Sequence, residues 1–385
     1  MAVRPPWPWS PGSGPRLLLG LSSGTSADAL DLVLLQVEGH PYPERIAPLA
    51  GDMVAMPAEL QTQVRTASEA TLEQLAALQF ALGRWMGRTA ADFLQREGIQ
   101  PQDLFAAGSH GQTIFHHDGV PAGGTLQWGD PAVLAAALGC PVVADFRWSD
   151  LAAGGQGAPL SPLADWLCFR SATASVAVLN LGGIANLSLI QGQRPPRAWD
   201  CGPANGPMDE LCRRRGLGPF DQDGRLAASG QVQEELLRAL KKDPFFSRKL
   251  PRSTGLERFG APLLDRIDNL APDLTVADQL ATLVELAAWA VADSLERANW
   301  SEGPVYLAGG GARNPTLRKA LVTALGESRP LRPFAESGWD PDLREAMAFA
   351  LLADAFLLGQ PASWPETTGV SAPAILGRWT PPPIS

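Results

Sequence analysis

The chain has 385 residues, of which 45% are apolar and 18% are charged, and its formal net charge is -9. A chain of this length is too long for one ordinary hydrophobic core, so we expect two domains. The acidic balance argues against a nucleic-acid partner, which generally requires a basic face. The four cysteines form no CxxC pair, which argues against a zinc site or a disulfide framework and favours a reducing compartment.

Two terminal features bear on location. Residues 1–15 are rich in proline and lack the apolar core of a signal peptide, so we expect a disordered leader. The longest apolar run near the C-terminus, Phe349 to Leu358, contains Asp354 and is too short to span a membrane. We therefore predict a cytoplasmic protein with no membrane partner.

Three elements are predicted in the N-terminal half, in chain order. Arg16 to Glu38 is typical of a β-hairpin whose turn is rich in glycine and hydroxyl side chains. Thr71 to Glu97 places apolar residues at helical spacing and predicts a long amphipathic helix. The segment GGQGAP, Gly154 to Pro159, follows the apolar run PVVADF and is expected to be a glycine loop that leaves a strand.

Four elements are predicted in the C-terminal half. Val176 to Ile190 is a second hairpin pattern around GGIAN, and Thr275 to Arg297 is a second long amphipathic helix. Val305 to Leu321 predicts a buried strand, a glycine loop and a helix with Asn314 as its N-cap. Leu343 to Leu358 predicts the last helix. Because a strand–glycine–strand unit occurs in each half, we expect two similar α/β domains rather than one sheet.

The first glycine turn is a candidate phosphate-binding loop. Gly24, with Ser23, Thr25 and Ser26 beside it, can present backbone N–H groups and hydroxyls in one concavity, and such a nest binds phosphate oxygens. Asp28 lies just downstream, where a carboxylate near phosphates usually serves Mg²⁺, an ion that retains most of its waters. An ordinary hairpin turn explains the same residues.

The other glycine segments, Gly182–Gly183 and Gly309–Gly311, are ambiguous when each is taken alone. Two glycine turns in separate halves, together with a strand-to-helix glycine loop, are better explained by a nucleotide held between two domains. Close packing of helix on strand would also select glycine at Gly309–Gly311. No GxxxxGK[ST] segment occurs and no GxGxxG follows a strand, so the sequence excludes a P-loop and lacks the usual Rossmann fingerprint.

Asp200, in WDCGPANGPMDEL, is the candidate general base. We expect it at the end of a strand and before a Gly-Pro turn, where a carboxylate can point into a cleft beside an attacking nucleophile. Capping of the turn, or of a helix that begins near Pro207, is the structural alternative.

Two further polar residues follow apolar runs and are weaker candidates for substrate contacts. His110 lies in GSHGQT, where a partly buried histidine with satisfied hydrogen bonds is the default interpretation. Arg147 lies in ADFRWSD and can bind a carboxylate through its planar fork, although a salt bridge to Asp145 or Asp150 would also explain it.

Taken together, these segments resemble the anhydro-N-acetylmuramic acid kinase family over nearly the whole chain after about residue 16. The resemblance rests on motifs that occur in order along the chain: GLSSGTSADALD (20–31), GSHGQT (108–113), LQWGDPAVLA (126–135), PVVADFRWSDLAAGGQGAPL (141–160), LNLGGIAN (179–186), DCGPAN (200–205), DQDG (221–224), STGLERF (253–259), GGGARNP (309–315) and REAMAFALLA (344–353).

The resemblance implies an α/β fold with two ribonuclease-H-like (actin-like ATPase) domains and a nucleotide cleft between them. We place these domains at residues 16–175 and 176–385, and the last helix could cross back to the first domain. The implied activity uses ATP and Mg²⁺ to phosphorylate O6 of 1,6-anhydro-N-acetylmuramic acid while water opens the anhydro ring. The product is N-acetylmuramic acid 6-phosphate, an intermediate of peptidoglycan recycling. The implied partners are the small-molecule sugar and ATP, and a homodimer is left open.

The resemblance also implies roles for individual residues. Asp200 takes the place of the family's catalytic aspartate, and Asp28 is the Mg²⁺ candidate, largely through water. Sugar-side candidates are Arg147, Glu345 and His110. The nucleotide-binding residues implied by the resemblance are Gly24, Thr25, Ser26, Ala27, Asp28, Ala29, Leu30 and Asp31 in the first phosphate loop, Gly182 and Gly183 in the second, and Gly309, Gly310 and Gly311 at the adenosine.

Two alternatives remain open from the residues. One is a plain sugar or hydroxy-acid kinase of the same fold, in which the base would deprotonate a substrate hydroxyl and no ring would open. The other is a non-catalytic nucleotide-dependent sensor or filament module. The fold does not decide among them, because one fold hosts many functions. The acid at position 200 favours an enzyme, since a sensor or filament needs no base beside a sugar pocket.

Overall fold

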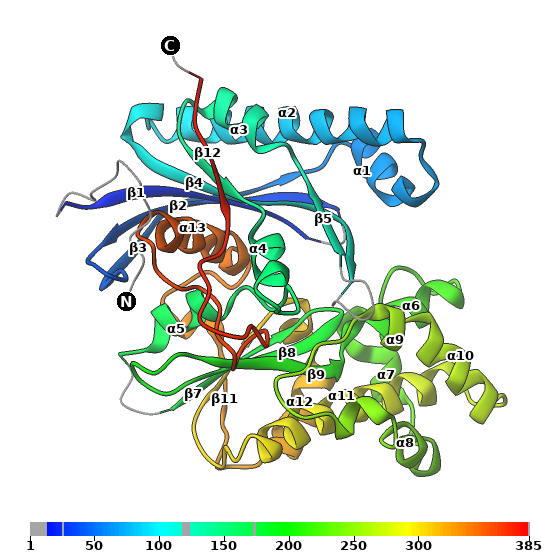
Figure 1. Cartoon of the computed structure of the whole chain (residues 1–385). Helices are drawn as coiled ribbons and strands as arrows, with labels where there is room; N and C mark the ends of the chain where they lie inside the picture. Colours follow the sequence, from blue (N-terminus) through cyan, green and yellow to red (C-terminus); the bar gives the residue numbers. More distant parts are fainter. Residues whose placement is uncertain (1–13, 25–26, 118–123, 172–174, 384–385) are drawn as a thin grey trace. The chain divides into compact units, whose positions relative to one another are not determined.

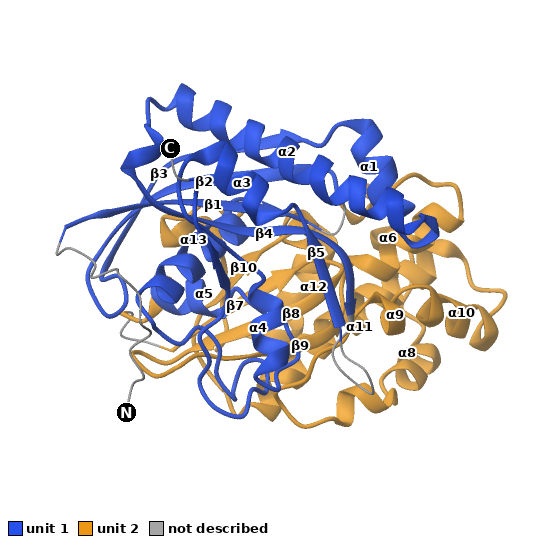
Figure 2. Ribbon diagram, turned by 45° about the horizontal axis from the view of Figure 1, so that its top comes forward, with its two compact units in different colours: residues 1–167, 343–385 blue, residues 168–342 orange. Residues whose placement is uncertain are grey.

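The computed structural model describes residues 14–24, 27–117, 124–171 and 175–383. The chain forms two compact units, shown in blue and orange in Figure 2: unit 1 comprises residues 1–167 and 343–385, and unit 2 comprises residues 168–342. These bounds differ from the predicted domains chiefly at the C-terminus, because the last helix packs on the sheet of unit 1.

Unit 1 is built on one mixed sheet, with the strand order β12-β6-β4-β1-β2-β3 and with β5 paired to β4 (Figure 1). Its strands are β1 (Arg16–Ser23), β2 (Ala29–Glu38), β3 (Arg45–Ala55), β4 (Leu104–His117), β5 (Gly124–Trp128), β6 (Val142–Ala144) and β12 (Arg378–Thr380). Its helices are α1 (Ala58–Arg65), α2 (Leu72–Arg96), α3 (Pro131–Leu138), α4 (Phe146–Ala152), α13 (Arg344–Leu357) and most of α5 (Pro162–Phe169), at whose end the unit boundary falls.

Unit 2 has the strand order β11-β10-β7-β8-β9. Its strands are β7 (Val176–Leu181), β8 (Ile184–Ile190), β9 (Arg197–Pro203), β10 (Val305–Ala308) and β11 (Leu331–Pro333). Its helices are α6 (Asn205–Arg214), α7 (Arg225–Ser229), α8 (Glu234–Leu240), α9 (Leu256–Phe259), α10 (Ala261–Leu270), α11 (Val276–Arg297) and α12 (Pro315–Leu325). Short 3₁₀ helices in the two units are η1 (Ala67–Glu69), η2 (Pro101–Asp103), η3 (Gln222–Gly224), η4 (Pro244–Ser247), η5 (Gly310–Arg313) and η6 (Phe334–Ser337).

The two sheets share one topology. In each, three consecutive strands pair antiparallel, β1-β2-β3 in unit 1 and β7-β8-β9 in unit 2. A fourth strand then pairs parallel to the first, and a fifth pairs parallel to the fourth. This is the ribonuclease-H-like arrangement, so the predicted fold class of each half is confirmed. None of the helices in the described part of the chain combines the length and the apolar character that a membrane span requires.

Local signals in the sequence account for most of these elements. Both glycine turns that were predicted from hairpin patterns connect antiparallel strands, β1 to β2 and β7 to β8. The long helix α2 begins with a reciprocal capping box between Thr71 and Gln74. Asn314 caps α12 by accepting hydrogen bonds from the backbone N–H groups of Thr316 and Leu317, as predicted.

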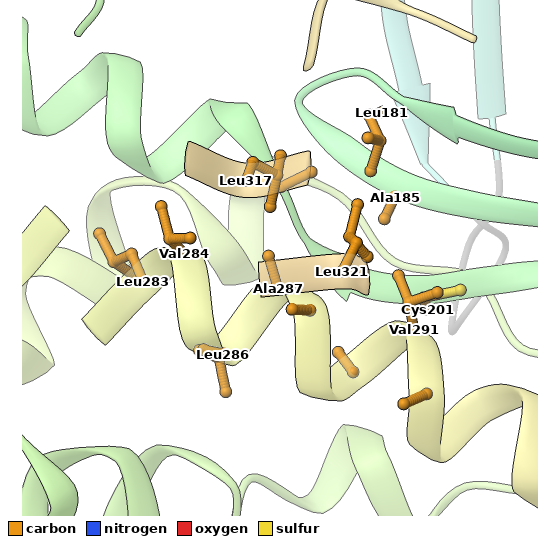
Figure 3. Close-up of a cluster of buried hydrophobic side chains, with 14 of the residues drawn as sticks. Leu181, Ala185, Cys201, Leu283, Val284, Leu286, Ala287, Val291, Leu317 and Leu321 are labelled. Carbon is orange, nitrogen blue, oxygen red and sulfur yellow. The ribbon is translucent and has the colours of Figure 1, made fainter. Parts of the chain in front are cut away.

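The core of unit 2 lies between its sheet and helices α11 and α12. Figure 3 shows Leu181, Ala185 and Cys201 of the strands near Val291 of α11 and Leu321 of α12. Each of these side chains is almost completely buried. Burying a side chain of leucine size contributes roughly 1.5–3 kcal/mol, so α11 supplies much of the stability of this unit.

Helix α13 lies against the sheet of unit 1 because two glycines make room for its backbone. Gly20 and Gly108 are register partners on the parallel strands β1 and β4. A Cβ atom on Gly20 would lie 1.9 Å from the carbonyl oxygen of Ala346, and one on Gly108 would lie 2.0 Å from that of Phe349. Only glycine permits this close approach of helix to strand. The pair of glycines therefore explains why the last helix belongs to unit 1.

Two buried ion pairs hold the two ends of α13. Arg344, at its first residue, forms two hydrogen bonds with the carboxylate of Asp165, at 2.8 and 2.6 Å. Asp354, in its last turn, accepts from Arg16 at 2.7 and 3.0 Å. All four side chains are at most 6% exposed. Leaving either partner of such a pair buried alone would be costly, so these contacts help to specify where the helix docks.

Candidate active site

Asp200 lies within β9, not at its end, and α6 begins at Asn205, close to the predicted start near Pro207. Its carboxylate oxygen Oδ2 accepts hydrogen bonds from Ser253 Oγ at 3.0 Å and from the backbone N–H of Thr254 at 2.8 Å. Both donors come from a segment far along the chain. Capping of α6 is therefore not the role of this side chain, and the N-cap residue of that helix, Ala204, makes no side-chain capping hydrogen bond.

The surroundings of Asp200 make its carboxylate a stronger base than an exposed aspartate. Burial raises the pKa of Asp200 to about 6. The hydrogen bonds from Thr254 and Ser253 favour the charged form and partly oppose this effect. The nearby carboxylate of Glu257 also raises this pKa, and the guanidinium of Arg252 lowers it. At neutral pH the group is mostly ionised but still binds a proton readily, which suits a general base.

Three glycine-containing segments of unit 2 meet at the carboxyl ends of β7 and β10. The N–H groups of Ala204 and Gly206 donate to the carbonyl oxygen of Gly183, and the N–H of Asn205 donates to that of Gly182. The side chain of Asn205 donates to the carbonyl oxygen of Leu181 at 2.9 Å. The GGIAN turn and the DCGPAN segment thus form one structure, and ligands of open α/β sheets bind at this edge.

The Gly309–Gly311 loop lies beside these two segments. Its three glycines differ in whether the surrounding atoms leave room for a side chain. Gly309 has a φ of 79°, and a Cβ on it would lie 2.7 Å from Oδ1 of Asn180. A Cβ on Gly311 would lie 2.8 Å from Nδ2 of Asn205. Gly310, in contrast, is exposed and a Cβ there would meet nothing within 4 Å. Packing therefore explains Gly309 and Gly311 but not Gly310.

We expect Gly310→Ala to weaken ATP binding several-fold while the free energy of unfolding stays within roughly 0.5 kcal/mol of the parent. The added methyl group would enter open space on the face where the adenosine is expected to approach. Titration calorimetry with a non-hydrolysable ATP analogue and thermal unfolding measure the two quantities. Gly309→Ala is the contrasting variant, and it should lose stability because alanine strains at positive φ. Unchanged affinity in Gly310→Ala would remove this loop from the nucleotide site.

The first predicted phosphate loop lies at the end of β1 in unit 1. Gly24 and Ala27 form a turn in which the N–H of Ala27 donates to the carbonyl oxygen of Gly24 at 3.0 Å. Thr25 and Ser26 lie outside the described residues. The predicted residues Ala29, Leu30 and Asp31 form the start of β2, where the side chain of Leu30 is fully buried in the core.

Asp28 is exposed beside this turn and suits the predicted Mg²⁺ role. Within the described residues, no group of three or more His, Cys, Asp and Glu side chains is arranged to hold a metal ion. Mg²⁺ commonly binds through one or two carboxylates together with substrate phosphates and water, so a single carboxylate beside a candidate phosphate loop fits its chemistry.

Gln112 is a residue of this site that the sequence analysis missed. Ser23 Oγ donates to Oε1 of Gln112 at 2.7 Å, and Nε2 of Gln112 donates to the carbonyl oxygen of Gly24 at 3.0 Å. The side chain is fully buried and ties the turn to β4. Its position two residues after His110, in the same motif, was the signal available in the sequence.

His110 and Arg147 contact each other directly. Nε of Arg147 donates to Nε2 of His110 at 3.0 Å, so the imidazole is neutral and carries its proton on Nδ1. Burial, and then the charge of Arg147, lower the pKa of His110 well below its ordinary value. The ring stacks on Phe349 at 4.5 Å between centroids. His110 is therefore buried, as the default interpretation expected, but its hydrogen bonds are not all satisfied, because the buried Nδ1 has no hydrogen-bond partner within the described residues.

Arg147 also contacts the glycine loop at residues 154–159, donating to the carbonyl oxygen of Gly157 at 2.7 Å. This loop does not leave a strand as predicted, because helix α4 intervenes between it and β6. Glu345 is exposed in the first turn of α13, where Ser22 Oγ lies 3.5 Å from its Oε2. The three sugar-side candidates thus all belong to unit 1.

Two ribonuclease-H-like units, with glycine turns at their strand ends and a buried carboxylate, have the fold class of the actin-like ATPases and sugar kinases. A hexokinase from Schistosoma mansoni complexed with glucose is 15% identical, with a TM-score of 0.39 over 88% of this chain and 85% of that one. A ROK family glucokinase from Streptomyces griseus in complex with glucose and AMPPNP is 14% identical, with a TM-score of 0.36 over 87% and 99%. Such distant likeness does not identify a family.

The chain belongs to the anhydro-N-acetylmuramic acid kinase family, whose model matches residues 16–382. A relative of that name from Pseudomonas putida is 42% identical over 368 residues, which cover 94% of this chain and 98% of the relative. Another from Bordetella pertussis is 43% identical over 374 residues, covering 95% and 96%. A third, from Caldanaerobacter subterraneus, is 35% identical over 382 residues.

Proposed function

We propose that the protein uses ATP to phosphorylate O6 of 1,6-anhydro-N-acetylmuramic acid while water opens the anhydro ring. The product is N-acetylmuramic acid 6-phosphate, and the role is the recycling of peptidoglycan in the cytoplasm. Membership of the kinase family supports the substrate. The observation that carries the chemistry is the Asp200 carboxylate, which is only 7% exposed and whose Oδ1 accepts no hydrogen bond within the described residues.

In the proposed reaction, Oδ1 of Asp200 takes a proton from water while the water oxygen bonds to the anomeric carbon. The bond between that carbon and the bridging O6 breaks, and O6 takes the γ-phosphoryl group of ATP as the bond to ADP breaks. The proton on Asp200 then returns to solvent. Apart from this proton transfer, the residues of the chain form no covalent bonds in the reaction. Positioning of the water, the sugar and ATP therefore supplies most of the rate.

The remaining candidates divide between the two substrates. The glycine segments around Gly24, Gly182 and Gly310 would hold ATP through backbone N–H groups. Asp28 would hold Mg²⁺, which neutralises phosphate charge when it is bound. Binding of the nucleotide between the two domains stays a prediction.

On the sugar side, the fixed guanidinium of Arg147 suits a carboxylate, the acidic group of a muramic acid. Glu345 would bind sugar hydroxyls.

The assignment is tested by comparing two sugars under Mg-ATP. We expect the anhydro sugar to be converted to a phosphorylated product that has gained one water, and to turn over far faster than N-acetylmuramic acid with its ring already open. Mass spectrometry of the product and coupled ADP release measure both. A phosphorylated product that retains the anhydro ring, or equal rates on the two sugars, would indicate the plain kinase. Binding of both ligands without a product would indicate a sensor.

A further inference from the structure

Arg252 is a buried cation that no carboxylate pairs with in the described part of the chain. Its side chain is 3% exposed, and its guanidinium lies 4.5 Å from the ring of Phe245. Its hydrogen bonds go to neutral oxygens, namely the carbonyl oxygens of Asp200 (3.3 Å), Cys201 (3.4 Å), Phe245 (3.2 Å) and Phe246 (2.8 Å) and the hydroxyl of Ser294 (3.0 Å). The charges of Asp293 and Asp200 favour the charged guanidinium, although neither carboxylate forms an ion pair with it in the described part of the chain. Burial of a charge without a direct ion pair is costly and calls for an explanation.

The hydrogen bonds of Arg252 join three elements of unit 2. They connect β9, the 3₁₀ helix η4 and α11. The backbone adds a further contact, since the N–H of Asp200 donates to the carbonyl oxygen of Arg252 at 2.9 Å. Residue 252 is thereby fixed against β9 at the position of the proposed base. The next two residues, Ser253 and Thr254, therefore lie beside the carboxylate of Asp200.

We propose that the segment Arg252–Thr254 is a positioning device for the base, holding Oδ2 of Asp200 so that Oδ1 alone accepts the proton from water. This inference rests on the function proposed above for Asp200. Ser253 Oγ and the N–H of Thr254 both donate to Oδ2, which stops rotation of the carboxylate about its last bond. A base held in one orientation avoids the loss of rate that misplacement by an ångström causes.

The same segment also controls the charge of Asp200. The charged and titratable groups that face this carboxylate are Arg252, Glu257 and the thiol of Cys201, whose pKa burial raises to about 12, so that it stays neutral. The hydroxyl of Ser253 stabilises the ionised carboxylate and so opposes the effect of burial. Removal of that hydroxyl should raise the pKa of Asp200, and the acid limb of activity should move to higher pH.

The test compares Ser253→Ala with Ser253→Thr, which keeps the hydroxyl. We expect Ser253→Ala to move the acid limb of kcat, and the pKa of the Asp200 carboxyl, upward by roughly one pH unit. At pH values well below the acid limb, kcat of Ser253→Ala should therefore be roughly tenfold lower than that of the parent, while the KM for ATP is unchanged. Ser253→Thr should restore both. The carboxyl is followed by ¹³C NMR of aspartate-labelled protein, with Asp200→Asn to assign the signal.

Ser247→Ala is the matched control, because that hydroxyl donates to the Pro244 carbonyl oxygen in the neighbouring η4 and is exposed. If Ser253→Ala does not fold, Ser253→Cys offers a much weaker donor of similar size. The inference is overturned if Ser253→Ala has the same acid limb and the same Asp200 carboxyl pKa as the parent. This holds even if Asp200→Asn is inactive. If Asp200→Asn is active, the proposed base fails, and the NMR titration alone then decides whether Ser253 controls this carboxyl.

Discussion

Replacing Asp200 by asparagine is expected to lower turnover of the anhydro sugar by roughly 10²–10⁴-fold, the usual contribution of a general base. The amide oxygen can still accept from Ser253 and Thr254, so the side chain should keep its place, but an amide accepts no proton from water. Affinity for ATP should change little. Steady-state kinetics and calorimetry measure these quantities, and Asp265→Asn, an exposed carboxylate of unit 2 that is paired with Arg214, is the matched control.

The same variant should gain stability, and the sign follows from the pKa. Asp200 has an ordinary value of 3.8 when unfolded and about 6 when folded, so the folded state binds the proton more tightly. The contribution of Asp200 to the free energy of unfolding is therefore fully present below pH 3.8 and is lost as the pH rises through 6. At pH 8, Asp200→Asn should be more stable than the parent by on the order of 1–3 kcal/mol, and this gain should disappear towards pH 4. A variant that folds but turns over at the parent rate would exclude Asp200 as the base. Lower stability at pH 8 would instead make the charge structural.

Breaking the buried pair at the start of α13 is expected to have the largest effect on stability. Asp165→Ala leaves the guanidinium of Arg344 buried without its carboxylate, which should cost roughly 3–5 kcal/mol in the free energy of unfolding. Denaturant unfolding at constant pH measures this. Activity should fall as well, because Glu345 follows Arg344 in the first turn of the same helix.

Two variants make this second prediction specific. Asp52→Ala removes an exposed ion pair with Arg96 in the same unit and should cost at most about 1 kcal/mol. Replacing both partners of the buried pair, with Asp165→Leu and Arg344→Met, should recover much of the loss, since apolar residues of similar volume need no partner. A loss below 1 kcal/mol in Asp165→Ala would mean that the glycine contacts of α13 determine its docking.

The features that the sequence predicted correctly are those with local causes. Hairpin turns, amphipathic helices and the Asn314 cap depend on residues within a few positions of one another, and the structure contains each of them. The incorrect predictions concern boundaries. Asp200 was expected to end its strand, and the loop at residues 154–159 was expected to follow one, because a single sequence does not show how far a strand or helix continues.

By itself, the sequence determined the order of elements, the family and the identity of the candidate base. Only the tertiary structure decided which residues surround that base and where the last helix lies. Ser253 and Thr254 reach Asp200 across more than fifty positions, and α13 returns to β1 across more than three hundred. Neither contact leaves a periodic signal, because hydrogen bonds to a buried carboxylate and the close approach of a helix to Gly20 depend on folded geometry rather than on spacing along the chain.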